Sequence, residues 1–170
     1  MSPRIVLVGP MGVGKTTVGE LLSVRLGCRF RDTDADIVAA EGRAISDIFA
    51  EDGEEHFRAL ERRAVANALS THEGVVALGG GAVMDPGTRE LLTKRPVVHL
   101  TMGIQEAAER IGLGVTRPLL TVDPLRQWRE LMQARRPLYT EVARVAVSTD
   151  GQAPEEVAQA VLDALKLTQA

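Results

Sequence analysis

Residues 9–16 read GPMGVGKT and match the pattern G-x-x-x-x-G-K-[ST]. The stretch stands between a short apolar run, RIVLVG at residues 4–9, and a helical pattern, TTVGELLSVRLG at residues 16–27. A strand followed by this turn and a helix is the context in which a phosphate-binding P-loop forms. Its glycines let backbone N–H groups turn inward, and the helix N-terminus adds its dipole. The sequence therefore predicts a nucleotide site at this turn.

The side chains of the loop indicate how a nucleotide would be held. We expect Lys15 to reach the β- and γ-phosphates of ATP, and the Thr16 hydroxyl to ligate Mg²⁺ as the cofactor. The nucleotide-binding residues predicted from the loop are Gly12, Val13, Gly14, Lys15, Thr16 and Thr17.

Four further β-rich runs follow the P-loop and alternate with helical patterns. The runs are FRDTD, VVALGG, VVHLTM and VAVST, which begin at residues 30, 75, 97 and 145. This alternation predicts an α/β fold of three layers with a five-stranded parallel sheet. The expected helices cover about residues 36–70, 86–94, 104–112, 125–143 and 154–167. Because ligands bind at the carboxyl ends of such strands, the residues after each strand are the first candidates for chemistry.

Length and charge restrict the class of protein further. The chain has 170 residues, which suits a single domain over residues 1–170. A net charge of −3 argues against a nucleic-acid partner. Cys28 is the only cysteine, and the N-terminal apolar run is too short for a signal peptide or a membrane span. We expect a cytoplasmic monomer with small-molecule partners, neither nucleic acid nor membrane.

The other loops decide among the classes of P-loop protein. The sequence contains no D-x-x-G and no N-K-x-D, so the usual guanine-nucleotide machinery is missing. It also has no apolar strand that ends in the Asp of a Walker B segment, because VVALGG ends in glycines and VVHLTM in Thr and Met. A carboxylate that helps to hold Mg²⁺ must then come from FRDTD. This combination favours a small-molecule kinase, which also needs a carboxylate to orient the acceptor hydroxyl.

The acidic stretch RDTDAD, residues 31–36, supplies both carboxylates. If the strand extends through residue 34, Asp32 and Asp34 project to the same face, with Asp32 toward the metal and Asp34 toward the acceptor. The alternative is that both residues only cap a helix or make a turn. Asp36 falls inside the next helical pattern, so we expect it to be an acid in the first turn of a helix.

Glycines and arginines complete the candidate site. The run GGG at residues 79–81 suggests a ligand close to the backbone, although a plain turn is the alternative. Arg58 has Glu54 and Glu61 one helical turn away, which leaves a surface salt bridge open. Arg135 and Arg136 precede Pro137, where the helix is expected to bend or break and to turn at least one guanidinium into the cleft. An anionic acceptor would suit such arginines.

Arg117 lies in GLGVTRPLL, between glycines and a proline. This composition predicts a mobile lid at about residues 112–124 that closes over ATP and brings a charge. The three histidines, His56, His72 and His99, have no partner pattern, and we expect structural or surface roles for them.

The order and spacing of GPMGVGKT, DTD, FR, GGG, TRPLL and RRPLY resemble the shikimate kinases over nearly the whole chain. The resemblance implies a P-loop kinase fold like that of nucleoside monophosphate kinases, with a mobile lid and a shikimate-binding region at about residues 32–61. It implies transfer of the ATP γ-phosphate to the 3-hydroxyl of shikimate, a step toward chorismate and the aromatic amino acids. A gluconate or nucleoside monophosphate kinase, or a non-catalytic P-loop regulator, remains the alternative.

The resemblance also implies roles for individual residues. The catalytic residues would be Lys15, Asp34 and Arg117, and the metal would be held by Thr16 and, through water, by Asp32. Nucleotide contacts beyond the P-loop would come from Arg110, Arg117 and Pro154. The residues implied in shikimate binding are Asp34, Arg58, Gly79, Gly80, Gly81 and Arg136.

Overall fold

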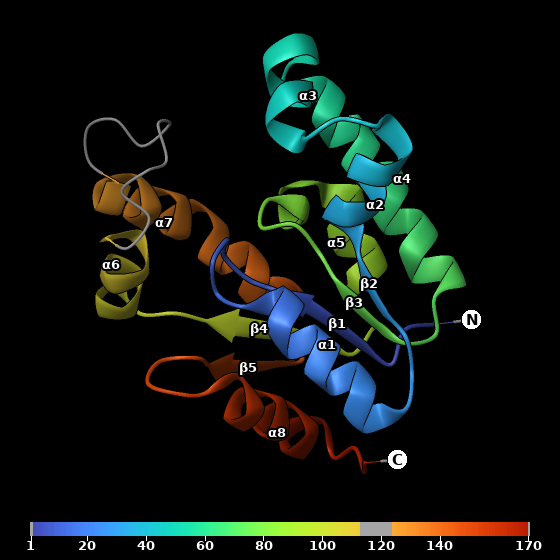
Figure 1. Cartoon of the computed structure of the whole chain (residues 1–170), viewed down its shortest axis with the longest axis vertical. Coiled ribbons are helices and arrows are strands. Elements are labelled where there is room, and N and C mark those ends of the chain that lie inside the picture. The colour runs from blue at the N-terminus through green and yellow to red at the C-terminus, as the bar shows by residue number, and fades with distance from the viewer. Residues whose placement is uncertain (1, 113–123, 170) are drawn as a thin grey trace.

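The computed structural model describes residues 2–112 and 124–169. Its centre is one sheet of five strands in the order β2-β3-β1-β4-β5, and all neighbouring strands run parallel (Figure 1). The predicted α/β class and the five-stranded parallel sheet are confirmed. The strands are β1 (Ile5–Val8), β2 (Phe30–Asp32), β3 (Val75–Ala77), β4 (Val97–Thr101) and β5 (Val145–Ser148).

Helices connect successive strands, as parallel pairing requires. Those described are α1 (Lys15–Leu26), α2 (Thr33–Glu41), α3 (Ile45–Asp52), α4 (Glu54–Thr71), the short 3₁₀ helix η1 (Ala82–Met84), α5 (Pro86–Leu92), α6 (Ile104–Gly112), α7 (Pro124–Val142) and α8 (Pro154–Leu165). The helical region expected at 36–70 is three separate helices, because Gly42 and Gly53 adopt positive φ values of 66° and 87° between them.

Both faces of the sheet are covered, which gives the three expected layers. In β1, Ile5 and Leu7 belong to the apolar cluster shared with α1 and α8, whereas Val6 and Val8 belong to the cluster shared with α4, α5 and α7. All four side chains are buried, as expected for a central strand with helices on both sides. A third cluster, Ile37, Ile48 and Phe57, joins α2, α3 and α4.

The cover leaves the carboxyl ends of the strands accessible. Figure 1 shows α3 and the first turns of α4 on one side of the P-loop, and α6 with the start of α7 on the other. The predicted lid, apart from its two end residues, and Arg117 lie outside the described residues. Within residues 2–112 and 124–169, no helix has the length and apolar character needed to cross a membrane.

Pro137 does not break α7, contrary to one of the two outcomes expected for it. The helix runs without interruption from Pro124 to Val142 with Pro137 inside it. Pro137 has no N–H for the usual bond to the carbonyl of Gln133, so the helix is held at this point by its packing. Val142 and Tyr139, both buried in the cluster under α7, supply that packing.

The backbones of β2 and β3 approach closely at Gly74, and a substitution there tests whether this approach is required. A Cβ at Gly74 would overlap the carbonyl oxygen of Arg29, and this same oxygen accepts the Val75 N–H at 2.9 Å where the two strands begin to pair. We expect Gly74→Ala to lower the free energy of unfolding by about 1–3 kcal/mol, measured by urea denaturation.

Gly87→Ala is the matched control for this prediction. A Cβ at Gly87, in α5, would meet only the end of the Asp85 side chain at 3.1 Å. Its unfolding free energy should stay within about 1 kcal/mol of that of the parent chain, since alanine is the better helix former. Equal effects of the two substitutions would contradict the proposed backbone constraint.

Candidate active site

The P-loop joins β1 to α1 and has the predicted form. Gly14 is the N-cap of α1 with a φ of 99°, and a Cβ at Gly9 would lie 2.5 Å from the carbonyl oxygen of Leu100. Glycine is therefore required at these two positions, for φ at one and for space at the other. The Lys15 ammonium donates to the carbonyl oxygens of Gly9 and Pro10 at 2.7 and 2.9 Å.

Lys15 is half-buried at the floor of the site. Burial lowers the pKa of its ammonium to about 8; the carboxylates of Asp34 and Asp32 act in the opposite direction, and Arg135 adds to the lowering. The amine therefore stays mostly charged at neutral pH. Its position at the start of α1 places this charge beside the helix N-terminus, where a phosphate is favoured.

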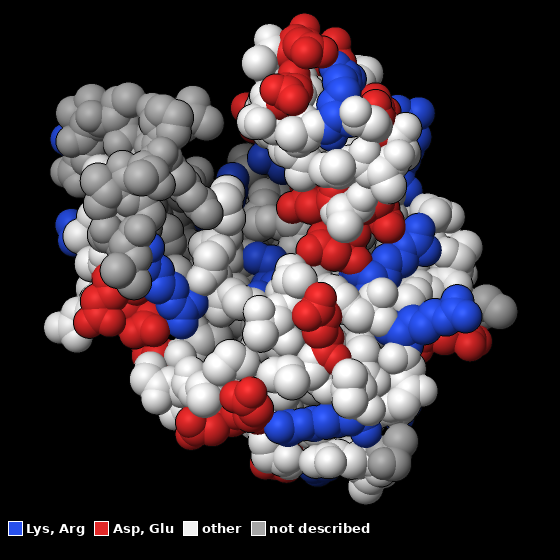
Figure 2. Space-filling view, viewed as in Figure 1, with Lys and Arg blue, Asp and Glu red and all other residues white. Residues whose placement is uncertain are grey.

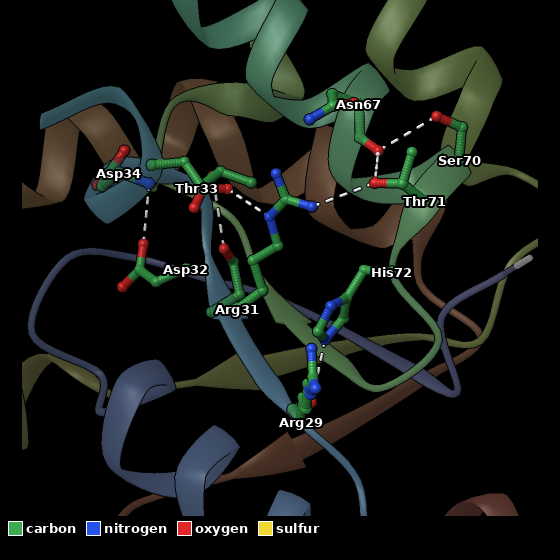
Figure 3. A network of polar contacts seen from close by, with 11 residues as sticks. Arg29, Arg31, Asp32, Thr33, Asp34, Asn67, Ser70, Thr71 and His72 are labelled. Atoms are coloured by element: carbon green, nitrogen blue, oxygen red, sulfur yellow. Dashed lines mark hydrogen bonds and ion pairs between the residues drawn. The ribbon is translucent and has the colours of Figure 1, made fainter. Parts of the chain in front are cut away.

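The local structure of DTD differs from the strand end that we expected. Strand β2 ends at Asp32, and α2 begins at Thr33. Asp32 is the N-cap of α2: its Oδ1 accepts the backbone N–H of Asp34 at 2.9 Å (Figure 3). The alternative of a capping role is confirmed for Asp32, and the extended conformation of Asp34 was wrong. Capping satisfies a helix N–H that a longer strand would leave without a partner.

Asp32 also reaches the P-loop through its other oxygen. The Thr16 hydroxyl donates to Asp32 Oδ2 at 3.0 Å, so the two predicted metal residues lie in contact. A hydroxyl and a carboxylate beside a phosphate-binding loop are the oxygen ligands that suit Mg²⁺, which keeps most of its waters and needs few protein groups. The residues present therefore fit the metal that the fold family implies.

Asp36 has the structural role that we predicted. It lies in the first turn of α2, and its Oδ2 pairs with Arg31 Nε at 2.6 Å. The same guanidinium donates to the Thr71 hydroxyl of α4 at 3.2 Å (Figure 3). Arg31 thus ties β2, α2 and α4 together and leaves Asp36 no part in the site.

Asp34 carries the least compensated negative charge in the site. Its Oδ1 is buried and has no hydrogen-bond partner among the described residues. Burial raises its pKa to about 6, and the negative charges of Asp32 and Glu61 add to the rise, against Lys15 and Arg58. A carboxyl group of this kind is typical of functional sites, because a hydroxyl donor or a cation would relieve it.

Glu61 is a site residue that the sequence analysis took only as a salt-bridge partner. It is 4% exposed, and its Oε1 accepts from Arg58 Nη1 at 2.7 Å. Glu61 lies four residues from both Phe57 and Val65, which are buried on the same face of α4. This apolar spacing, interrupted by one acid, was the signal that could have revealed its burial.

Arg58 makes helical salt bridges and also faces the glycine run, so it has both of the roles considered for it. It pairs with Glu61 and, more loosely, with Glu54 at 3.5 Å, so the helical salt bridges are present. Its guanidinium also lies beside Gly81, where a Cβ would come within 2.6 Å of it. Arg58 is therefore held in place by carboxylates while it faces the glycine run.

Two of the three glycines make room for charged groups. A Cβ at Gly79 would lie 2.7 Å from Asp34 Oδ1 and 2.9 Å from Glu61 Oε2, whereas one at Gly80 would meet Arg135 Nη1 at an ordinary contact distance of 3.5 Å. A plain turn does not require the closeness found at Gly79 and Gly81. We call residues 79–81 the glycine strip. It is a stretch of backbone on which carboxylates and guanidinium groups converge. A hollow of about 490 Å³ opens beside it against Arg58, Glu61 and Gly81.

Of the two adjacent arginines in α7, the structure brings Arg135 to this strip. Arg135 is half-buried, acts electrostatically on Lys15, and has an Nε that is buried without a partner among the described residues. Arg136 is exposed and lines a separate hollow of about 230 Å³ with Ile104 and Trp128. Successive helical residues point about 100° apart, so only one of the pair can face the strip. We therefore replace Arg136 by Arg135 in the candidate site.

The predicted adenine residues lie at the α6 and α8 ends of the sheet. Arg110 Nη1 donates to the carbonyl oxygen of Gly12 at 2.7 Å, so α6 contacts the P-loop directly. Pro154 begins α8 after a loop in which both Asp150 carboxylate oxygens accept the Gly103 N–H, at 3.0 and 3.1 Å. These bonds fix the loops after β4 and β5 against each other.

The charges surround one hollow. Figure 2 shows Lys or Arg atoms inside the hollow between the α2–α4 side and the α6–α7 side, and acidic side chains on its α2–α4 wall. A phosphate-binding loop on one wall and a carboxylate with two guanidinium groups near a bare backbone strip on the other can hold a phosphate donor and a small anionic acceptor together. The fold and this site define a P-loop kinase of small molecules.

Comparison with known proteins narrows this class. The family model for shikimate kinase matches residues 11–166, and the chain belongs to the shikimate kinase family. It is 66% identical to a shikimate kinase of Streptomyces avermitilis, over 99% of this chain and 98% of that protein. A shikimate kinase of Streptomyces coelicolor is 60% identical, with 99% of both chains covered.

A solved structure supports the same assignment. Shikimate kinase from Acinetobacter baumannii, in complex with shikimate, is 39% identical and superposes with a TM-score of 0.87. The match covers 96% of this chain and 92% of that one.

The raised pKa of Asp34 predicts a gain of stability when its charge is removed. The folded-state pKa of about 6 exceeds the ordinary value of 3.8, so Asp34 is destabilising once pH rises through 6 and neutral in effect below about 4. One pKa unit corresponds to about 1.4 kcal/mol, so Asp34→Asn should raise the free energy of unfolding by roughly 1–3 kcal/mol at pH 8. Urea denaturation at pH 8 and pH 4 should show that the gain disappears at the lower pH.

Asp36→Asn is the matched control, two residues further along α2. It removes the ion pair with Arg31 and should lower the unfolding free energy at pH 8 by about 0.2–1 kcal/mol. A loss of stability in Asp34→Asn at pH 8 would contradict the unfavourable charge that we assign to Asp34.

Proposed function

We propose that the protein transfers the γ-phosphate of ATP to the 3-hydroxyl of shikimate and releases shikimate 3-phosphate and ADP. This reaction is a step in the synthesis of chorismate and the aromatic amino acids. The observation that carries the proposal is the convergence of Asp34, Arg58 and Arg135 on the glycine strip next to Lys15 of the P-loop. The substrate-binding region, residues 32–61, corresponds to α2, α3 and the start of α4.

ATP binds at the P-loop through residues 12–17. Lys15 exchanges the carbonyl oxygens of Gly9 and Pro10 for the β- and γ-phosphate oxygens, to which it is drawn by full negative charge. Arg110 and the loop before Pro154 receive the adenine. Arg117 stays a prediction as the lid residue that reaches the phosphates.

Mg²⁺ is the cofactor, held by Thr16 directly and by Asp32 through water. Their contact at 3.0 Å beside the P-loop supports this pairing. When bound, the ion neutralises the charge that develops on the transferred phosphate. The Asp32 carboxylate keeps its cap on α2 through the other oxygen, which fixes its orientation.

Asp34 orients the acceptor hydroxyl and is the candidate base. Its buried Oδ1 has no partner within the described part of the chain, so a substrate hydroxyl supplies the hydrogen bond that this oxygen needs. With a pKa near 6 it is mostly ionised at neutral pH and close to the range in which proton transfer is efficient. Residues 79–81 line the substrate ring.

The shikimate carboxylate binds between Arg58 and Arg135. Each guanidinium approaches one glycine of the strip, Arg58 at Gly81 and Arg135 at Gly80. A charge-assisted hydrogen bond contributes about 1.5–3 kcal/mol, so two arginines on one carboxylate discriminate strongly against uncharged polyols.

The alternatives are less well supported. A gluconate or nucleoside monophosphate kinase would share the P-loop and the fold, but the chain belongs to the shikimate kinase family. A regulator without turnover would have no need for the raised pKa of Asp34 in contact with the glycine strip.

We also propose that the enzyme acts as a monomer in the cytoplasm, without nucleic acid or membrane partners. The net charge of −3 argues against a nucleic-acid partner, because phosphate backbones attract basic proteins.

A coupled assay of ADP release tests the function. Purified protein with ATP and Mg²⁺ should release ADP with shikimate, and not with gluconate or nucleoside monophosphates. Asp34→Asn should still bind ATP but have a kcat lower by at least about 100-fold, the size typical of a lost general base. Turnover with gluconate and none with shikimate would refute the proposal.

The adjacent arginines of α7 give a matched pair for the carboxylate site. Arg135→Ala should raise the KM for shikimate by about 10- to 100-fold, because it removes a charge-assisted hydrogen bond, while the KM for ATP changes little. Arg136→Ala removes the same charge one residue away and should change the KM for shikimate by less than about twofold. The reverse order of effects would restore Arg136 to the site.

A further inference from the structure

Tyr139 is the only tyrosine of the chain, and its side chain is wholly buried on the inner face of α7. Its hydroxyl donates to the carbonyl oxygen of Gly80, the middle residue of the glycine strip, at 2.5 Å. Tyr139 follows Arg135 by four residues, so the two side chains leave α7 on the same face. The helix that supplies a substrate-binding arginine therefore also holds the backbone of the strip.

The hydroxyl of Tyr139 also lies in the field of Arg135. The charge of the Arg135 guanidinium opposes the rise in the pKa of Tyr139 that burial causes. The same guanidinium lies beside Gly80, where a Cβ would come 3.5 Å from Arg135 Nη1. Arg135 and Tyr139 therefore meet at Gly80, and the Tyr139 hydroxyl holds the backbone of that residue.

The ring of His99, in β4, packs against the ring of Tyr139. The two ring centroids are 4.8 Å apart, and His99 is 4% exposed with no partner for Nε2 among the described residues. Burial, together with the charges of Arg136 and Lys15, lowers the pKa of His99 to about 4, so the ring is neutral. Two flat rings packed in the core leave the Tyr139 hydroxyl little freedom to move.

Pro137 lies next to this anchor. It is midway between Arg135 and Tyr139 and has no N–H to bond to the carbonyl of Gln133. The bond of Tyr139 to Gly80 adds a contact outside the helix that stabilises this part of α7. Gly80 in turn rests on the P-loop, since a Cβ there would lie 3.4 Å from the Met11 nitrogen and 3.6 Å from the Gly9 oxygen.

We propose that Tyr139 is a positioning residue for the acceptor: it aims the Arg135 guanidinium at the substrate carboxylate and fixes Gly80 against the P-loop. This inference rests on the proposed function. Tyr139 itself does not contact the reacting atoms. Replacing it by phenylalanine keeps the ring packing on His99 but leaves the Gly80 carbonyl, which lies beside Arg135, without its hydrogen-bond donor.

Steady-state kinetics of Tyr139→Phe test the proposal. The KM for shikimate should rise about 10- to 100-fold, whereas kcat should fall less than about threefold and the KM for ATP should change less than about twofold. The matched control is Ser23→Ala, which removes another buried hydroxyl whose oxygen donates to a backbone carbonyl, that of Gly19, at 2.8 Å. The control should leave both KM values unchanged.

A spectroscopic measurement tests the link to Arg135 separately. Because the chain has one tyrosine, labelling tyrosine with ¹³C at Cζ gives a single NMR resonance for Tyr139. Saturating shikimate should shift this resonance in the wild-type protein as the guanidinium turns to the carboxylate. In Arg135→Ala the shift should be lost even when the substrate concentration is raised to saturation.

Three results would overturn the inference. An unchanged KM for shikimate in Tyr139→Phe, with normal wild-type turnover, would refute the positioning role alone. Equal increases in the KM values for shikimate and ATP would show that Tyr139 only supports the fold. An absence of shikimate-dependent turnover in the wild-type protein would refute the proposed function and this inference with it.

Discussion

The parallel register of β2, β3 and β1 is the constraint on which the site depends. Asp32 and Leu7 are both level with Ala77, the last residue of β3. The P-loop, the DTD turn and the glycine strip therefore start from the same edge of the sheet at the same height. A slip of one strand by a single residue would turn its side chains to the other face and separate the carboxylates from Lys15.

The charges at this edge balance one another incompletely. Asp32, Asp34 and Glu61 stand among Lys15, Arg58 and Arg135, and most of these groups are tied to a specific partner by hydrogen bonds. Asp34 Oδ1 and Arg135 Nε are the exceptions, both buried without a partner among the described residues, and the pKa of about 6 for Asp34 reflects its burial near two other carboxylates. The Asp34 charge therefore lowers the stability of the fold, and a bound hydroxyl would compensate it, which is a common relation between stability and function.

Features with a local signature could be predicted from the sequence. The P-loop, the strand and helix alternation, and the glycine run all depend on neighbouring residues and were found where expected. We expected α2 to begin later in the chain, because residues 32–34 suit both the end of a strand and the start of a helix. The bond from the Asp34 N–H to Asp32 Oδ1 decides for the helix. The choice of Arg135 over Arg136 depends on which face of α7 is turned toward the site. Glu61 and Tyr139 have their roles because segments far along the chain bury them. Such long-range packing has no local pattern, apart from the apolar stripe around Glu61.

The cations that contact the P-loop carbonyls have a consequence for the energetics of nucleotide exchange. Lys15 and Arg110 together occupy the carbonyl oxygens of Gly9, Pro10 and Gly12. The loop is thus preorganised by internal ligands, and most of its conformational entropy is lost before ATP arrives. Arrival of the phosphates is then a swap of one oxygen partner for another. Because a phosphate carries full negative charge and a carbonyl does not, the swap favours the nucleotide, and the same carbonyl oxygens receive the cations again when ADP leaves.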